Sequence, residues 1–203
     1  VANLTGTFTA GQTATIAGVG SLVINSDGTY TFTPVANYNG SVPVVTYTTN
    51  TGSTSTLTIN VTAVNDDPVD GNETNTVTED TTLTVADGAA GDLLNNATDV
   101  DGDTLTITGY TIGGITGTQV VGQPVVIANV GTLTINANGS YSFVPASNFT
   151  GTIPVITYTV SDGKGGTDTS TLTLSMAAVN DPSVLVADTK TVAEDTVANG
   201  NVL

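Results

Sequence analysis

The chain has 203 residues, which is enough for one large domain or two modest ones. Its formal net charge is −16, with 18 acidic residues against two basic ones, and this argues against nucleic acid or an anionic membrane as a partner. It contains no Cys and no His, so thiol chemistry, disulfides, zinc sites and Ser-His triads are excluded.

Five segments in the first part of the chain alternate Thr or Ser with apolar residues, which is typical of strands with one buried face. They are residues 13–17, 21–25, 29–33, 42–48 and 54–62. A hairpin turn is predicted at Ser26-Asp27-Gly28, because Gly supplies the positive φ that such a turn needs. This register places Leu22, Ile24, Tyr30 and Phe32 on the core side. Helix-favouring residues are few and no apolar run approaches about 18 residues, so an all-β chain without a membrane-spanning helix is predicted.

The acidic residues concentrate around two stretches, Asn65-Asp66-Asp67-Pro68 and Asp99-Val100-Asp101-Gly102-Asp103. Residues 66–103 hold eleven of the 18 acids and neither Lys nor Arg, so no basic partner is expected within reach. Three carboxylates at alternate positions, with a Gly between two of them, suit a hard cation that takes six to eight oxygen ligands. Ca²⁺ is therefore the predicted counter-charge, and a solvated acidic loop without an ion is the alternative.

The sequence also repeats once. Residues 19–53 match residues 130–164 at a constant offset of 111, and beyond a four-residue insertion the offset becomes 115. The second offset relates Asn65-Asp66 to Asn180-Asp181. It also carries the pair Glu79-Asp80 onto Glu194-Asp195. A repeat of this length indicates tandem β-sandwich domains rather than a solenoid, whose units are shorter.

The repeat divides the chain into three predicted parts. They are a β-sandwich unit that lacks its first strand or strands (1–65), a complete calcium-binding unit (66–180) and the first strand of a following unit (181–203). Joined tail to head, residues 181–203 and 1–65 read as one shorter unit. Three interpretations stay open: one period of a longer array, an arbitrary excerpt of a longer chain, or a filament in which the tail strand completes the first unit of the next copy.

Several motifs, in their order and spacing, resemble the cadherin-like tandem repeats of giant bacterial RTX-type surface adhesins. They are VNDDP, TEDTTLTV, GDLLNNATDVDGDTLTITGYTI, GTLTINANGSYSFVP and YTVSDGKGGTDTSTLTL, and the resemblance covers essentially the whole chain. It implies Greek-key, Ig-like β-sandwiches joined end to end, with calcium rigidifying the junctions. It also implies an extracellular, cell-surface protein in which most repeats are extenders that hold a terminal adhesive domain away from the cell.

The resemblance further assigns candidate calcium ligands. It places the aspartates of residues 99–103 in an end loop that faces the first junction, and Glu79-Asp80 at an early-strand position that is often linked to calcium in such repeats. Asp162 is expected to join the loop, whereas the first copy has Thr49-Asn50-Thr51-Gly52 there and lacks this acid. The full predicted set is Asn65, Asp66, Asp67, Glu79, Asp80, Asp99, Asp101, Asp103, Asp162, Asn180 and Asp181.

The predicted function is structural: a calcium-rigidified extender of a long adhesin or filament, without catalysis. Its expected partners are neighbouring repeats of the same chain or filament, with a cell-surface or glycan target bound through other domains. A carbohydrate-binding module that uses a loop such as residues 111–117 is the alternative. Glycoside hydrolysis by paired aspartates is not favoured, because Trp is absent and Tyr30, Phe32, Tyr141 and Phe143 are all predicted to be core residues.

Overall fold

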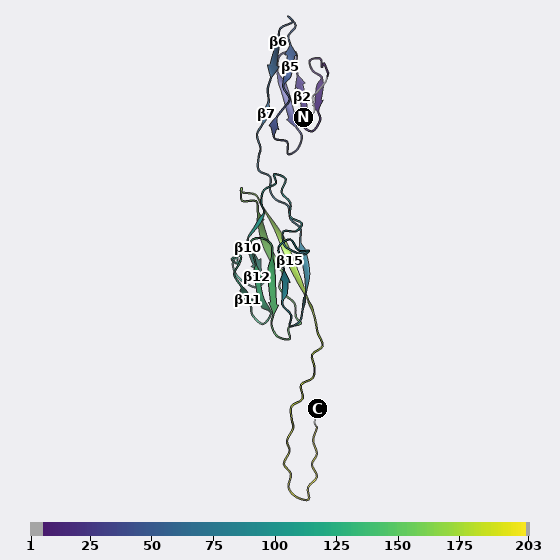
Figure 1. Ribbon diagram of the computed structural model, residues 1–203, viewed down its shortest axis with the longest axis vertical. Coiled ribbons are helices and arrows are strands. Elements are labelled where there is room, and N and C mark those ends of the chain that lie inside the picture. Colours follow the sequence, from purple (N-terminus) through teal and green to yellow (C-terminus); the bar gives the residue numbers. More distant parts are fainter. Residues whose placement is uncertain (1–5, 202–203) are drawn as a thin grey trace. The chain divides into compact units, whose positions relative to one another are not determined.

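The computed structural model describes residues 6–201 (Figure 1). These residues form fifteen strands and no helix, which confirms the all-β class. The strands are β1 Thr13–Ile16, β2 Gly20–Ile24, β3 Tyr30–Pro34, β4 Gly40–Ser41, β5 Val45–Thr48, β6 Thr54–Leu57, β7 Asn60–Val61, β8 Glu73–Thr78, β9 Leu83–Val85, β10 Thr106–Ile112, β11 Val125–Ile127, β12 Gly131–Ile135, β13 Tyr141–Pro145, β14 Ile156–Ser161 and β15 Thr167–Ala177. In this part of the chain there is no helix of the length and apolar character that crossing a membrane requires.

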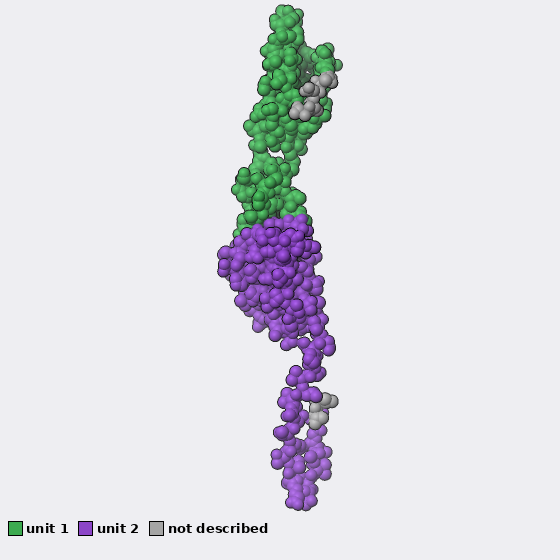
Figure 2. All heavy atoms as spheres, in the orientation of Figure 1, with its two compact units in different colours: residues 1–71, 96–108, 159–170 green, residues 72–95, 109–158, 171–203 purple. Residues whose placement is uncertain are grey.

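The chain divides into two compact units, coloured green and purple in Figure 2. Unit 1 comprises residues 1–71, 96–108 and 159–170, and unit 2 comprises the remaining residues. We call β1–β7 the first sandwich and β8–β15 the second sandwich. The predicted boundaries at residues 65 and 180 stay a prediction.

The first sandwich is built from short antiparallel pairs. Its sheets have the strand orders β1-β2-β3, β5-β6 and β4-β7. A small core of Ile16, Val19 and Val42 holds them together. Four partly buried side chains pack against this core: Phe32, Tyr38, Ile59 and Val61.

The second sandwich has two four-stranded sheets, with the orders β11-β12-β13-β9 and β10-β14-β15-β8. Every pair in the first sheet is antiparallel, whereas β8 lies parallel to β15, from Glu73 beside Leu172 to Thr78 beside Ala177. The inward side chains alternate along the strands, as in β13, where Tyr141 and Phe143 are fully buried. The core is therefore considerably larger than that of the first sandwich.

The predicted strands of the first sandwich are confirmed, with two interruptions. In the segment 42–48 the strand begins only at Val45, because Pro43 has no N–H to donate, although the Val42 N–H still donates to the Ile59 carbonyl oxygen; the segment 54–62 is divided between β6 and β7. The core prediction is wrong for Tyr30, which is 53% exposed although its repeat counterpart Tyr141 is 1% exposed. Tyr141 lies beside β9, and no strand of the described residues occupies the matching edge beside Tyr30.

Candidate metal centres

The three aspartates of residues 99–103 form one group of carboxylates. Oxygen atoms of Asp99, Asp101 and Asp103 all lie within 4.8 Å of one another. The backbone holds this arrangement, since the Asp99 Oδ1 atom accepts hydrogen bonds from the N–H groups of Asp101 (2.8 Å) and Asp103 (3.2 Å). Gly102, at φ +76°, lets the loop turn sharply enough for both bonds. The alternate-position spacing therefore produces the predicted cluster.

The second oxygen of Asp99 gives this group its chemical character. Asp99 Oδ2 is buried and has no hydrogen-bond partner among the described residues. Leaving a buried carboxylate oxygen unsatisfied is costly, and a cation removes the cost by direct ligation. A group of oxygen ligands of this kind suits a hard ion such as Ca²⁺.

Lys164 corrects one sequence prediction about this group. Its Nζ atom lies 3.8 Å from Asp103 Oδ1, so the expectation that no basic side chain reaches the aspartate loop is wrong. The residues are 61 positions apart in the sequence, and the hairpin between β14 and β15 brings them together. The lysine side chain is 63% exposed, so the ion pair is weak. One lysine can balance only one of the three carboxylates.

The stretch Asn65-Asp66-Asp67 contacts the same end of unit 1. Asp66 donates its N–H to Asp101 Oδ2 at 2.8 Å, and the Asn65 side-chain amide donates to Asp162 Oδ2 at 2.6 Å. Asp67 lies close to Gly166, where a Cβ atom would lie 2.8 Å from Asp67 Oδ1. The structure thus brings the predicted residues of the first junction close together. The aspartates of residues 99–103 form the carboxylate cluster, and Asn65 and Asp66 are attached to this end by hydrogen bonds.

Asp162 acts mainly as a hydrogen-bond acceptor. Its Oδ1 atom accepts from the N–H groups of Lys164, Gly165 and Gly166, at 2.7, 3.1 and 3.0 Å, and closes the β14–β15 turn. The Asn65 amide lowers the pKa of this carboxyl most strongly, the three backbone donors act in the same direction, and burial opposes them. Asp162 is therefore held as a carboxylate that ties residue 65 to the turn.

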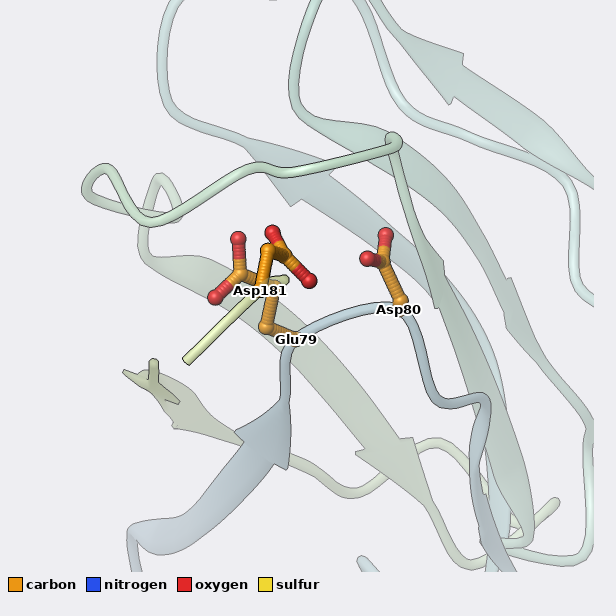
Figure 3. A group of neighbouring side chains, drawn as sticks. All are labelled: Glu79, Asp80 and Asp181. Atoms are coloured by element: carbon orange, nitrogen blue, oxygen red, sulfur yellow. The ribbon is translucent and has the colours of Figure 1, made fainter. Parts of the chain in front are cut away.

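A second carboxylate group lies in unit 2 (Figure 3). Oxygens of Glu79, Asp80 and Asp181 all lie within 4.8 Å of one another, although Asp181 is about a hundred positions further along the chain. Glu79 is only 5% exposed, and its Oε2 atom accepts from the N–H of Val179 at 2.8 Å. Asp80, at φ +56°, accepts from the N–H of Asn148 at 2.9 Å. The first bond fixes the turn after β8 against the segment that carries Asp181, and the second fixes it against the loop that follows β13.

Two other residues bear on the predicted set. Asn180 is exposed, and its role as a calcium ligand stays a prediction. Asp92 is 1% exposed and accepts from the N–H groups of Gly88 and Leu94, so it is a structural acid. Gly139 packs directly against Asp92, since a Cβ atom at residue 139 would collide with Asp92 Oδ1.

The surface of unit 2 also has a shallow hollow. It is lined by Thr74, Asn75, Thr76, Thr173 and Ser175, without an aromatic side chain. Protein sites that bind sugars by stacking need an exposed aromatic face. This hollow therefore gives the carbohydrate-binding alternative no support.

Comparison with known families identifies the class of protein. Residues 65–178 match the model of the bacterial cadherin-like domain, and residues 5–63 match a model of the cadherin-like domain. The chain belongs to the bacterial cadherin-like domain family. A search of curated protein sequences found no match.

Some solved structures show weak likeness. One is a nucleoside hydrolase-related hypothetical protein from Saccharophagus degradans that is associated with carbohydrate metabolism (16% identity, TM-score 0.38, 57% of this chain and 26% of that one). Two others are endo-fucoidan hydrolases of glycoside hydrolase family 107. They are MfFcnA4 (15%, 0.35, 86% of this chain and 23% of that one) and MfFcnA9 (14%, 0.29, 81% and 27%). This chain thus spans about a quarter of each, and TM-scores below 0.5 carry no argument about its activity.

Family membership gives the coarse function. Bacterial cadherin-like domains are extracellular or surface modules of the adhesion type, and they are typically not enzymes. They generally bind calcium, and the two acidic groups of this chain could hold a metal ion.

Proposed function

We propose that this chain is a calcium-dependent extender segment of a long extracellular adhesin of the RTX type, or of a filament. In this proposal, ions bound at the acidic groups stiffen the junctions between successive repeats. The observation that carries it is Asp99 Oδ2, a buried carboxylate oxygen without a hydrogen-bond donor inside a group of three aspartates. A chain with a net charge of −16 and two basic residues has little else to offer that oxygen.

The two groups would hold ions with different donor sets. Asp99, Asp101 and Asp103 would hold one, with Asp66 and Asp67 close by. The carboxylates of Glu79, Asp80 and Asp181 would hold the other. A bound Ca²⁺ would neutralise the mutual repulsion of the carboxylates and link segments that are far apart in the sequence.

The surroundings of these groups are compatible with a spacer. The strands present mainly Thr and Ser to solvent, with Tyr30 and Tyr47 also exposed, and the shallow hollow of unit 2 has no aromatic wall. The proposal includes no catalysis and no carbohydrate site in this segment. Adhesive contact with a cell surface or a glycan would come from other domains, and the immediate partners would be neighbouring repeats.

Calorimetric calcium titration of the whole chain tests the metal sites. We expect two binding events, one lost in Asp101→Asn/Asp103→Asn and the other lost in Asp181→Asn. Asp87→Asn/Asp188→Asn is the matched control, because it removes two negative charges at exposed positions outside both groups. Absence of binding in the unaltered chain, or equal loss in the control, would refute the sites.

Small-angle scattering tests the extender role separately. Calcium should narrow the distribution of particle dimensions of the unaltered chain, and the Asp101→Asn/Asp103→Asn variant should keep the broad distribution found in chelator. If calcium binds but leaves the distribution unchanged, the ions do not stiffen the junction and the extender mechanism fails.

A further inference from the structure

The first and last strands of the second sandwich pair with each other. These are β8 and β15, and they lie parallel over six paired residues. Glu73 lies beside Leu172 and Thr78 lies beside Ala177. The chain therefore enters β8 at one end of the pair and leaves β15 at the other end. The pair separates these two points by about 17 Å, at a rise of about 3.3 Å per residue.

The parallel direction determines how tension along the chain acts on this pair. Tension draws the start of β8 and the end of β15 apart along the strand axes, across the hydrogen bonds that join them. β8 can then leave only by sliding past β15, which strains the bonds of the pair together. In an antiparallel hairpin pulled at its two ends, the bonds would instead open one after another. A parallel pair of entry and exit strands therefore resists tension as a unit.

Hydrogen bonds beyond the six paired residues lengthen the attachment at both ends. Before the pair, the Thr171 N–H donates to Asn72 Oδ1 at 2.9 Å. After it, the Glu79 N–H donates to the Ala177 carbonyl oxygen at 2.9 Å, and the Val179 N–H donates to Glu79 Oε2 at 2.8 Å. The bonded stretch thus runs from residue 72 to residue 79 on one side and from residue 171 to residue 179 on the other.

The middle of the pair has side-chain bonds on the solvent face. Thr76 and Ser175 are directly paired and exposed, and their hydroxyl oxygens lie 3.1 Å apart within hydrogen-bonding distance. The Ser175 hydroxyl also donates to the Asn75 carbonyl oxygen at 3.3 Å. These hydroxyls therefore join the two strands in addition to the backbone bonds.

Separation of β8 from β15 would also open the core. In the part of the chain that the structure describes, β8 is the last strand of its sheet, with β15 as its neighbour. Val77 of β8 is 0% exposed, and the Asn75 side chain donates to the Tyr141 hydroxyl of the other sheet at 3.0 Å. Release of β8 thus uncovers apolar surface and breaks a bond between the sheets, so it commits the sandwich to unfold.

We propose that the parallel pair β8–β15 is the tension-bearing element of the second sandwich and sets the force at which this domain unfolds. The inference deepens the proposed function, because an extender transmits tension between its neighbours. The geometry of the strand pair itself is independent of calcium.

The carboxylates of Glu79, Asp80 and Asp181 lie at the exit end of the pair. Glu79 and Asp80 directly follow β8, and Asp181 is the fourth residue after β15. An ion held by all three would join the two strands beyond their last backbone bond, so β8 could not slide without loss of ligands. Calcium should therefore raise the unfolding force. This reinforcement, unlike the strand pair, rests on the proposed function.

Pulling on single molecules of the whole chain in two geometries tests the path of the force. Because the chain has no Cys, pairs of thiols introduced at exposed residues define where the force is applied. Val69→Cys with Ser183→Cys attaches the handles beyond opposite ends of the pair and strains it in shear. Thr82→Cys with Ser183→Cys attaches both handles at the exit end and peels the strands apart from there. We expect a several-fold higher unfolding force in shear at the same loading rate. Equal forces, or a lower force in shear, would overturn the proposal.

Substitutions in the shear geometry test the side-chain bonds. Thr76→Val/Ser175→Ala removes the two hydroxyls that join β8 to β15. Thr84→Val/Ser142→Ala is the matched control, because these two residues are paired directly between β9 and β13 in the other sheet. We expect the first variant to unfold at least about threefold faster at a given force, as for the net loss of one hydrogen bond, and the control to unfold like the unaltered chain. Equal acceleration in both variants would overturn the proposal, since general stability rather than the strand pair would then set the force.

Calcium separates this inference from the proposed function. In the shear geometry, calcium should raise the unfolding force of the unaltered chain and leave that of Asp181→Asn unchanged. If calcium binds in calorimetry but does not change the force, the metal sites stand and reinforcement of the pair by an ion is refuted. If calcium does not bind and shear still needs the higher force, the metal sites fail and the tension-bearing role of β8–β15 stands.

Discussion

Calcium should stabilise this chain through both acidic groups, and the size of the effect can be calculated. A ligand that binds only the folded state contributes RT ln(1 + [L]/Kd) to the free energy of unfolding. Extracellular calcium modules have Kd values of about 10⁻⁴–10⁻³ M, so ~10 mM calcium would contribute about 1.4–2.7 kcal/mol for each group. For a domain of about a hundred residues, where 1 kcal/mol moves Tm by about 4 °C, this is roughly 5–10 °C for each group.

Substitutions separate the two contributions. Asp101→Asn/Asp103→Asn keeps the shape of the loop but removes two of the three charges of the first group, so about half of the calcium shift should disappear. Asp181→Asn should remove the other half, because this exposed residue supplies the third carboxylate of the second group. Circular dichroism melting curves in calcium and in chelator measure both effects.

The control decides whether the effect is local. Asp87→Asn/Asp188→Asn relieves the same amount of general charge repulsion at exposed positions. It should raise the Tm slightly in chelator while retaining the full calcium shift. Calcium does not bind at these groups if the unaltered chain melts at the same temperature with and without calcium. The stabilisation is not local if this control loses as much of the calcium shift as the Asp101→Asn/Asp103→Asn variant.

Two further predictions concern the fold. Gly139→Ala should lower the Tm of the second sandwich well beyond the effect of Gly28→Ala on the first. Both glycines have φ +89°, so the strain of about 1–2 kcal/mol is common to them, but only at residue 139 would the new Cβ atom collide with Asp92. Equal losses in calorimetry would rule out that contact. As the pH falls below about 4, the chain should lose stability more steeply than its Asp162→Asn variant. The folded state lowers the pKa of Asp162, so this carboxylate contributes stability at higher pH that is lost when it is protonated. Denaturant unfolding at several pH values measures the free energy of unfolding of the unaltered chain, of Asp162→Asn and of Asn65→Ala, which removes the main hydrogen-bond donor to Asp162. Parallel pH profiles for the three proteins would contradict the assigned cause.

The comparison of Tyr30 with Tyr141 separates what local sequence decides from what it leaves open. The two residues lie in matching hairpins, SDGTYTF and NANGSYSF, and both face the side that alternation assigns to the core. Only Tyr141 is buried, because β9 and Asn75 of β8 cover it. Alternation fixes the face on which a side chain lies, whereas burial depends on strands that pair from elsewhere in the chain.

The acidic groups show the same division. The sequence by itself determined the cluster of Asp99, Asp101 and Asp103, because carboxylates at alternate positions around a Gly are brought together by local backbone turns. Tertiary structure alone decided that Asp181 joins Glu79 and Asp80, and that Lys164 reaches Asp103. These contacts close loops of roughly sixty to a hundred residues, and the free energy that closes them comes from the packing of the sheets rather than from the residues that meet.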